Sequence, residues 1–421
     1  MLGRALFYLL RLRERLWVRP LLNCLLAVLA VFAARGADYV TLGLIPHIDP
    51  GTTEKLLTVL SSSMLAVATF AVGSMVSAYA SASSSATPRA FALVLADDVS
   101  QNALSSFIAA FIYSVVGLIA LKTGLYGTNG NFVLFVLTIA VFAGVVVTFV
   151  RWVDNIARLG RIGSTIDKAE SATRTALKRR SAKPYLGGVP RKHTDDPSGT
   201  PVFGSGIGFI QHIDMGDLQD VATSLDTTID LTVLPGTFLT PDRPLACVTC
   251  KYVQLINEHR ARIADAVILG PERTFDGDPR FGLIVLSEIA GRALSPAVND
   301  PGTAIAILGR LTRLFFEYCE SLQDHPPKPE FDRVLVPGLR LADMCDDAFT
   351  AIARDGAGTV EVGLRLQKTF LALAATNDPE MKTQASRQSA LALTRAEQAL
   401  TLDADIDVLR DMAKQVAAAC A

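Results

Sequence analysis

The sequence predicts a membrane α-helical domain of four transmembrane helices, followed by a cytosolic α+β domain with a small β-barrel-like unit and a helical C-terminal part. Of the 421 residues, 50% are hydrophobic and 19% are charged. This composition is too apolar for an ordinary soluble protein and too charged for a purely embedded one. Because the apolar surplus ends near residue 153, we predict a transmembrane domain at 1–153, a basic connector and linker at 154–202, a small β-rich unit at 203–255 and an α-helical domain at 256–421.

Four apolar runs have the length of membrane spans, at about 21–34, 57–80, 103–121 and 132–152. A helix rises about 1.5 Å per residue, so roughly 20 residues cross a hydrocarbon layer of about 30 Å. The first run is the shortest and follows several arginines, an order that secretory signal peptides share. Trp17 and the flanking arginines favour a retained interfacial anchor instead.

Positive charge near the membrane predicts the orientation of the spans. The N-terminal arm carries five arginines and a basic segment follows the fourth span, whereas the first outer loop has only Arg35 and Lys55 and the second only Lys122. Positively charged flanks stay on the cytoplasmic side. We therefore expect both termini to be cytoplasmic.

The interiors of the spans exclude one class of transporter. No Asp, Glu, Lys, Arg or His lies in the middle of a span, so the fixed charges of proton relays and ion-coupled carriers are missing. The second span instead has small and hydroxyl residues at helical intervals on one face, namely Ser62, Ala66, Thr69, Gly73, Ser77 and Ser81. Such a face suits close packing between helices. The alternative is a hydroxyl-lined pore in an oligomer, and packing is the favoured interpretation.

The loop between the second and third spans concentrates charge at the predicted inner face of the membrane. Pro88 ends any helix that continues from the second span, and the segment after Asp97 and Asp98 can open the third. Arg89 lies between these two points. We weigh a structural contact between Arg89 and a carboxylate against a ring of charges that recruits ions.

The connector and the β-rich unit follow the spans. Residues 164–180 have helical spacing and predict a solvated basic helix, and 181–202 are rich in Pro and Gly. Alternation predicts strands at 206–213, 227–233, 238–239 and 244–248, with a helix at 215–225. The run V-L-P-G-T-F-L-T-P-D-R-P-L-A resembles the hairpin of barrel-sandwich modules related to biotinyl and lipoyl domains. It lacks their Met-Lys-Met, so we expect no covalent cofactor and a scaffold or docking role.

Cysteine and histidine residues give no metal site. Cys247 and Cys250 form a single C-x-x-C with His259 nearby, but no second pair follows. In a strand these two thiols point to opposite faces. We therefore predict buried thiols, no metal and no cofactor.

Residues 270–311 contain the most distinctive motif of the chain, in which R-A-L-S-P-A-V-N-D-P-G-T-A occupies 292–304. Asp278 is a typical helix cap and Pro279 a typical first helical residue. The pair therefore predicts a helix that runs to about 294. Asp300 before Pro301 repeats this pattern and predicts a second helix to about 322. Amphipathic helices follow at 342–354, 358–376 and within 386–419.

This motif resembles the signature of domain-of-unknown-function family 2254, a family of bacterial membrane proteins with no assigned activity. The matching residues are Arg273, Thr274, Asp278, Phe281, Gly282, Ala290, Arg292, Ala293, Leu294, Ser295, Pro296, Asn299, Asp300, Pro301, Thr303 and Ala304. Pro88, Arg89, Asp97 or Asp98, Gln101, Phe107, Phe111 and Tyr113 also match. After the fourth span, Arg151, Trp152 and Asp154 stand where the family pattern would place histidine. The resemblance implies a multi-pass protein of the bacterial inner membrane.

Eight residues of the motif form a structural joint or a candidate anion pocket: Arg273, Asp278, Glu288, Arg292, Ser295, Asn299, Asp300 and Thr303. A helix N-terminus beside an arginine and a hydroxyl attracts anions. Catalysis is disfavoured because no histidine accompanies Ser295 and no glycine-rich phosphate loop occurs. We favour two helix ends locked together, with ligand sensing as the second interpretation.

These features lead to a hypothesis of an oligomeric, passive channel-like or scaffold membrane protein with a cytosolic assembly or sensing domain. The alternative is an enzyme or signalling scaffold that the spans only tether. The expected partners are the lipid bilayer, further copies of the chain and a small anionic ligand. The net charge of −1 gives no argument for nucleic acid.

Overall fold

The computed structural model describes residues 17–39, 46, 48–85, 87–95, 97–158, 161–191, 199–249, 253–322 and 328–421. The chain divides into two compact units, and the boundary between them in the sequence lies between Thr165 and Ile166. The first is the N-terminal unit and the second the C-terminal unit.

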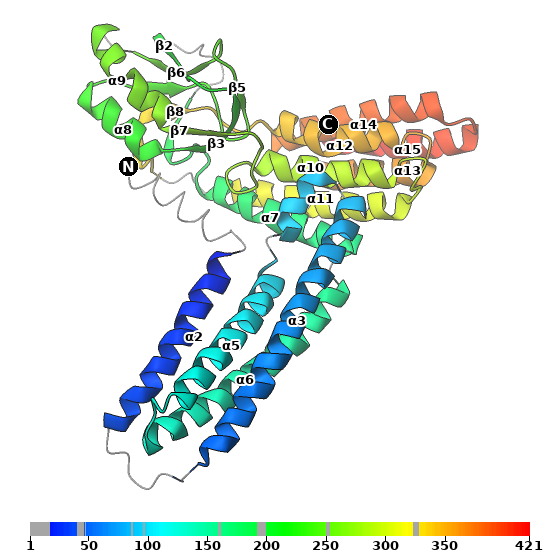
Figure 1. The fold of residues 1–421 in the computed structure, drawn as a ribbon. Helices are drawn as coiled ribbons and strands as arrows, with labels where there is room; N and C mark the ends of the chain where they lie inside the picture. The colour runs from blue at the N-terminus through cyan, green and yellow to red at the C-terminus, as the bar shows by residue number, and fades with distance from the viewer. Residues whose placement is uncertain are drawn as a thin grey trace. The chain divides into compact units, whose positions relative to one another are not determined.

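Among its described residues, the N-terminal unit has four long helices that run side by side (Figure 1): α2 (Val18–Gly36), α3 (Pro50–Ser85), α5 (Asp98–Lys122) and α6 (Thr128–Arg158). Each is long and apolar enough to cross a membrane, so the four predicted runs are confirmed as helices and as candidate spans. Shorter helices η1 (Ala37–Tyr39), η2 (Pro88–Ala90) and α4 (Phe91–Leu95) lie between them.

The interior of the four-helix unit is filled by side chains. Trp152 is 1% exposed and meets Phe70 and Phe107 edge to face, with ring centroids 6.1 Å apart in both pairs. Further along, the hydroxyls of Tyr113 and Thr138 lie 3.1 Å apart and are buried. These aromatic and hydroxyl contacts hold α3, α5 and α6 together.

The C-terminal unit contains two open sheets. The five-stranded sheet has the order β1-β8-β4-β6-β2 and the three-stranded sheet the order β5-β3-β7. The strands are β1 (Gly188–Pro190), β2 (Thr200–Phe203), β3 (Gly208–Ile213), β4 (Ile229–Leu231), β5 (Phe238–Leu239), β6 (Pro244–Val248), β7 (Val267–Gly270) and β8 (Phe331–Val336). The α+β class is therefore confirmed, and the barrel-like unit is not.

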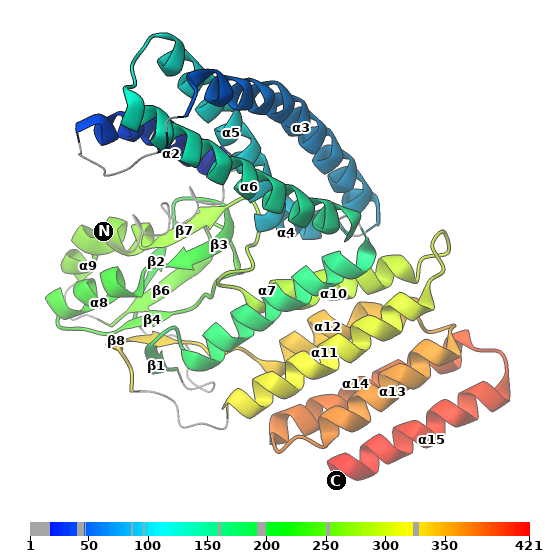
Figure 2. The same cartoon turned by 90° about the horizontal axis from the view of Figure 1, so that it is seen from below.

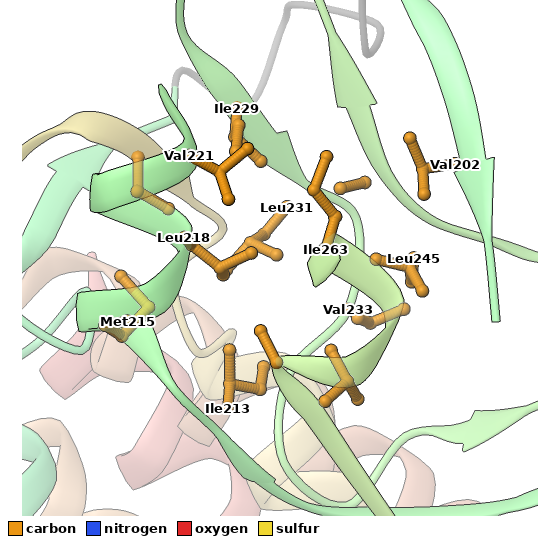
Figure 3. Close-up of a cluster of buried hydrophobic side chains, with 14 of the residues drawn as sticks. Val202, Ile213, Met215, Leu218, Val221, Ile229, Leu231, Val233, Leu245 and Ile263 are labelled. Atoms are coloured by element: carbon orange, nitrogen blue, oxygen red, sulfur yellow. The ribbon is translucent and has the colours of Figure 1, made fainter. Parts of the chain in front are cut away.

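Strand β8 explains why no barrel closes within 203–255. It pairs in parallel with both β1 and β4, although its residues lie about a hundred positions after β4 in the chain. Parallel neighbours need a long crossover, and here the crossover includes helices. An apolar core joins these sheets to α8 (Met215–Ser224) and α9 (Val253–Asp265), with Leu218, Leu231 and Ile263 in the middle of the cluster (Figure 3).

The rest of the unit is a layered array of helices (Figure 2): α7 (Ile162–Ala182), α10 (Pro279–Ala293), α11 (Pro301–Leu322), α12 (Leu341–Asp355), α13 (Val360–Ala374), α14 (Pro379–Ala399) and α15 (Asp403–Cys420). Three of them begin at an Asp-Pro pair. Asp278 and Asp378 accept from the backbone N–H groups of Phe281 and Met381. The predicted starts of α10 and α11 are thus confirmed.

Helix α7 differs from the predicted solvated helix. One face of it is buried: Ile166, Ala169, Glu170, Thr173, Ala176, Leu177 and Arg180. These residues recur every three or four positions, so they form one stripe along the helix. The high charge of the segment concealed this stripe, because two of its buried members are themselves charged.

Candidate functional site

The S-P-A-V-N-D-P turn is a compact joint between α10 and α11. The Asn299 N–H donates to the Ser295 carbonyl at 2.8 Å, and the Asp300 N–H donates to the Ala293 carbonyl at 2.8 Å. Asn299 has φ of +49°, a left-handed conformation that Asn tolerates better than most residues. The Ser295 hydroxyl donates to the Arg292 carbonyl at 2.7 Å. The polar groups of the turn therefore satisfy one another.

Asp300 caps α11 as the sequence predicted. Its carboxylate accepts from the Thr303 N–H at 3.1 Å and from the Thr303 hydroxyl at 2.6 Å. These two bonds lower the pKa of Asp300 below its ordinary value of 3.8. The cap therefore stays ionised and formed at any pH above that value.

Replacing Asp300 with alanine should lower the free energy of unfolding by about 1 kcal/mol at neutral pH, because a helix cap is lost. The pKa of Asp300 is lower in the folded than in the unfolded state, so this contribution is present above pH 3.8 and disappears as the pH falls through the folded value. Thermal unfolding of wild type and variant at pH 7 and pH 3 measures both. A difference that persists unchanged at pH 3 would contradict an ionised cap.

The opposite end of α10 carries a second charged group. Asp278 caps the helix, its side chain is 3% exposed, and Arg273 Nε donates to it at 2.6 Å. The Arg273 guanidinium also lies 5.5 Å from the centroid of the Phe281 ring. Arg280 then bridges α10 to α12 through Asp347 at 2.6 Å and Asp343 at 3.1 Å. Burial raises the pKa of Asp347, and the bond from Arg280 opposes that shift.

The structure thus separates the eight predicted site residues into two groups. Asp278 starts α10 and the Ser295–Asp300 turn follows its end, and 15 helical residues span about 22 Å. Arg273 and Asp278 form the first group, and Arg292, Ser295, Asn299, Asp300 and Thr303 form the second. Glu288 lies within α10, five residues before its last residue, Ala293. The eight side chains do not converge on one pocket.

Two contacts near Asp278 were not predicted from the sequence. Gly236, in the Pro235-Gly236 turn, lies so close that an added Cβ would overlap the Asp278 carboxylate, which brings the β-rich region against the start of α10. Arg180 of α7 donates from Nη2 to the Gly277 carbonyl at 3.1 Å. Both contacts join segments distant in the chain, so no local pattern indicates them.

An ion network around the buried carboxylate of Glu170 was also not predicted from the sequence. Glu170 of α7 has a side chain that is 6% exposed and contacts three arginines: Arg174 at 2.7 Å, Arg310 at 2.6 Å and Arg313 at 3.1 Å. Asp167 adds a bond to Arg310, and Glu317 adds one to Arg174. The network joins α7 to α11 and contains equal numbers of opposite charges.

In the N-terminal unit, the predicted charged loop fastens helices together. Asp97 caps α5 by accepting from the Ser100 N–H at 3.0 Å, and Asn155 of α6 donates to the same carboxylate at 2.7 Å. Asp98 forms an ion pair at 2.5 Å with Arg19 of α2. Arg89 is exposed in η2. These contacts link α2, α5 and α6 at one end of the unit.

The small and hydroxyl face of α3 points away from the other helices. Ser62, Thr69, Gly73 and Ser77 are all exposed. The hydroxyls of Ser62 and Thr69 donate to carbonyls of their own helix at 3.1 Å and 2.9 Å. An open groove of about 600 Å³ lies on this face and is lined by Phe70, Gly73, Ser74, Ser77, Ala78, Ser81 and Ile156.

Three cysteines of the C-terminal unit are buried, and Cys420 is partly exposed. Cys247, Cys319 and Cys345 are buried free thiols, and burial raises the pKa of Cys319 to about 12. Cys250 of the predicted C-x-x-C lies outside the described residues. Among the residues that the structure describes, no three His, Cys, Asp or Glu side chains gather as metal ligands.

The family model for predicted membrane protein DUF2254 matches residues 13–372. The chain belongs to this family. The match covers the four spans, the β-rich region and both ends of α10, and it ends within α13. The family resemblance of the 273–304 motif is therefore confirmed.

Relatives of this DUF2254 protein include an uncharacterised protein of Mycobacterium bovis and uncharacterised proteins of two Mycobacterium tuberculosis strains. Each is 26% identical over 330 residues, which is 74% of this chain and 62% of the relative. The chain thus spans less than two thirds of the length of these curated relatives. No solved structure matches it.

Proposed function

We propose that this DUF2254 protein is a subunit of an oligomeric membrane assembly, and that protomers contact one another through the outward face of α3. The assembly is a passive channel-like or scaffold protein of the bacterial inner membrane. Its C-terminal unit is cytosolic and serves assembly or sensing. The observation that carries the proposal is the exposure of Ser62, Thr69, Gly73 and Ser77 on one helix face.

Packing within the chain does not account for the glycine on this face. A Cβ added at Gly73 would have no heavy atom within 4 Å. In lipid, small residues favour association because they let helix backbones approach closely. The hydroxyls of Ser62 and Thr69 are already bonded within the helix, so the face needs no water to satisfy them. These properties fit a helix contact between protomers.

Any conduit in such an assembly would run between protomers. Within one protomer, Phe107, Tyr113 and Trp152 are fully buried between the helices. This filled interior also supports the alternative function, in which the spans only tether a cytosolic enzyme or signalling scaffold. The two functions differ in oligomeric state and in solute flux.

Replacing Gly73 or Ser77 with leucine should weaken self-association by about tenfold or more, since side-chain bulk separates the helices. Native mass spectrometry in lipid nanodiscs measures the oligomeric state. Val147→Leu on α6 is the matched control, because Val147 is 51% exposed and lies off the proposed contact. A wild-type monomer, or an equal effect of all three variants, would exclude the α3 contact.

Solute flux into reconstituted vesicles separates the remaining possibilities. A conduit predicts flux that falls in Ser77→Leu, whereas a scaffold predicts an assembly with no flux. A monomer with no flux would support the alternative function, in which the spans only tether the cytosolic unit.

The sensing role is tested separately. Replacing Asn299 and Asp300 should abolish the binding of a small anionic ligand, while the oligomeric state stays that of the wild type.

A further inference from the structure

Arg180 is a buried cation with an unused hydrogen-bond donor. It is 4% exposed, and its Nη2 donates to the Gly277 carbonyl at 3.1 Å. Its Nη1 is buried and has no hydrogen-bond partner among the described residues. A buried guanidinium nitrogen without an acceptor is costly, because it has lost its water without replacement.

The nearby carboxylates are already engaged by other groups. Asp278 interacts electrostatically with Arg180, but it accepts from Arg273 Nε at 2.6 Å and from the Phe281 N–H at 3.3 Å. Asp343 and Asp347 are bonded to Arg280. Arg180 and Arg273 therefore share one carboxylate at the start of α10. The helix N-terminus adds further positive potential there.

The space at this point suits only a compact ligand. An added Cβ at Gly236 would overlap the Asp278 carboxylate, and one at Gly277 would lie 3.4 Å from both the Gln211 carbonyl oxygen and Pro235 Cβ. A nucleotide or an organic acid would have to displace these backbone segments. Any anion bound at the start of α10 must therefore be small.

We propose that the Arg180 guanidinium, at the N-terminus of α10, binds one compact inorganic anion. The anion accepts the hydrogen bond of Nη1 and balances the second arginine beside Asp278. The site lies at the opposite end of α10 from the S-P-A-V-N-D-P turn. It does not depend on the proposed oligomerisation through α3.

The test uses the full chain in lipid nanodiscs, with sodium chloride, sodium phosphate and sodium gluconate compared at equal ionic strength. Chloride or phosphate should raise the thermal unfolding temperature above that in gluconate. Line broadening in ³⁵Cl NMR reports chloride binding directly. Arg180→Gln should weaken the binding by about tenfold or more, which corresponds to one charge-assisted hydrogen bond.

Arg179→Gln is the matched control, because it removes the same charge from the neighbouring position. The Arg179 side chain is 62% exposed and pairs with Asp276 at 3.2 Å. Its anion response should stay within about twofold of wild type, since exposed pairs contribute little. If the two variants lose the response equally, the effect is general screening and the site is refuted.

Arg180→Lys covers the case in which Arg180→Gln does not fold, since it keeps the charge and changes the donor geometry. It should fold and bind the anion more weakly than wild type. If neither variant folds, the anion titration of the wild-type protein still tests whether the site binds an anion. Equal stability in chloride, phosphate and gluconate, with no ³⁵Cl broadening, would overturn the proposal and leave water as the partner of Nη1.

Discussion

Replacing Glu170 with glutamine should lower the free energy of unfolding of the C-terminal unit by about 3 kcal/mol. The carboxylate is 6% exposed and faces Arg174, Arg310 and Arg313 at 3.1 Å or less. Removing one partner of a buried ion pair typically costs about 3–5 kcal/mol, because the other charge is left uncompensated. We expect the lower end of this range, since the three arginines are partly exposed. Denaturant unfolding followed by pulse proteolysis measures the loss.

Glu317→Gln is the control for this prediction. Within the described part of the chain Glu317 pairs only with Arg174, and its side chain is 36% exposed, so its loss should cost less than about 1 kcal/mol. Hydrogen exchange should then show α7 and α11 less protected in the Glu170 variant and nearly unchanged in the control. Equal effects of the two substitutions would mean that packing, rather than the ion network, fixes α7 against α11.

Replacing Gly282 with alanine should destabilise the C-terminal unit by about 1–3 kcal/mol, although alanine is the better helix former by about 1 kcal/mol. An added Cβ at Gly282 in α10 would overlap the Thr173 side chain of α7. Both residues are buried, and Thr173 already donates to the Ala169 carbonyl at 2.6 Å. The two helices must therefore separate to admit a methyl group. Thermal unfolding gives the sign and the size of the effect.

Gly163→Ala isolates the helix-propensity effect. Gly163 lies in α7, and a Cβ there would have no atom within 4 Å, so this change should be neutral or stabilising by up to about 1 kcal/mol. Adding Thr173→Ala to Gly282→Ala should restore part of the lost stability, because it frees the space that the methyl group needs. Stabilisation by Gly282→Ala alone would show that the close contact is absent.

The helices could be predicted from the sequence because their signals are local. Four apolar runs predicted the long N-terminal helices, and Asp278-Pro279 and Asp300-Pro301 predicted helix starts that the structure confirms. A helix cap depends on three or four consecutive residues, so it can be predicted from the sequence alone. The strands near β3, β4, β5 and β6 were likewise visible in alternating residues.

The candidate site was less predictable, because its geometry depends on distant segments. Asp278 and Asp300 both matched the family motif, yet α10 holds them apart. Arg180 and Glu170 belong to a segment whose composition predicts a solvated helix, and both are buried. A charged residue becomes buried only when a partner from elsewhere in the fold compensates for its lost hydration.

By itself the sequence determined that this protein has four spans, a mixed C-terminal unit and capped helices on both sides of the S-P-A-V-N-D-P turn. Only the tertiary structure decided that β8 joins β1 and β4 in an open sheet, and that Glu170 and Arg180 are buried. It also decided that the Gly73 face of α3 points outward. Hydropathy and capping act over a few residues, whereas strand pairing and the burial of charge depend on segments that meet only when the chain folds.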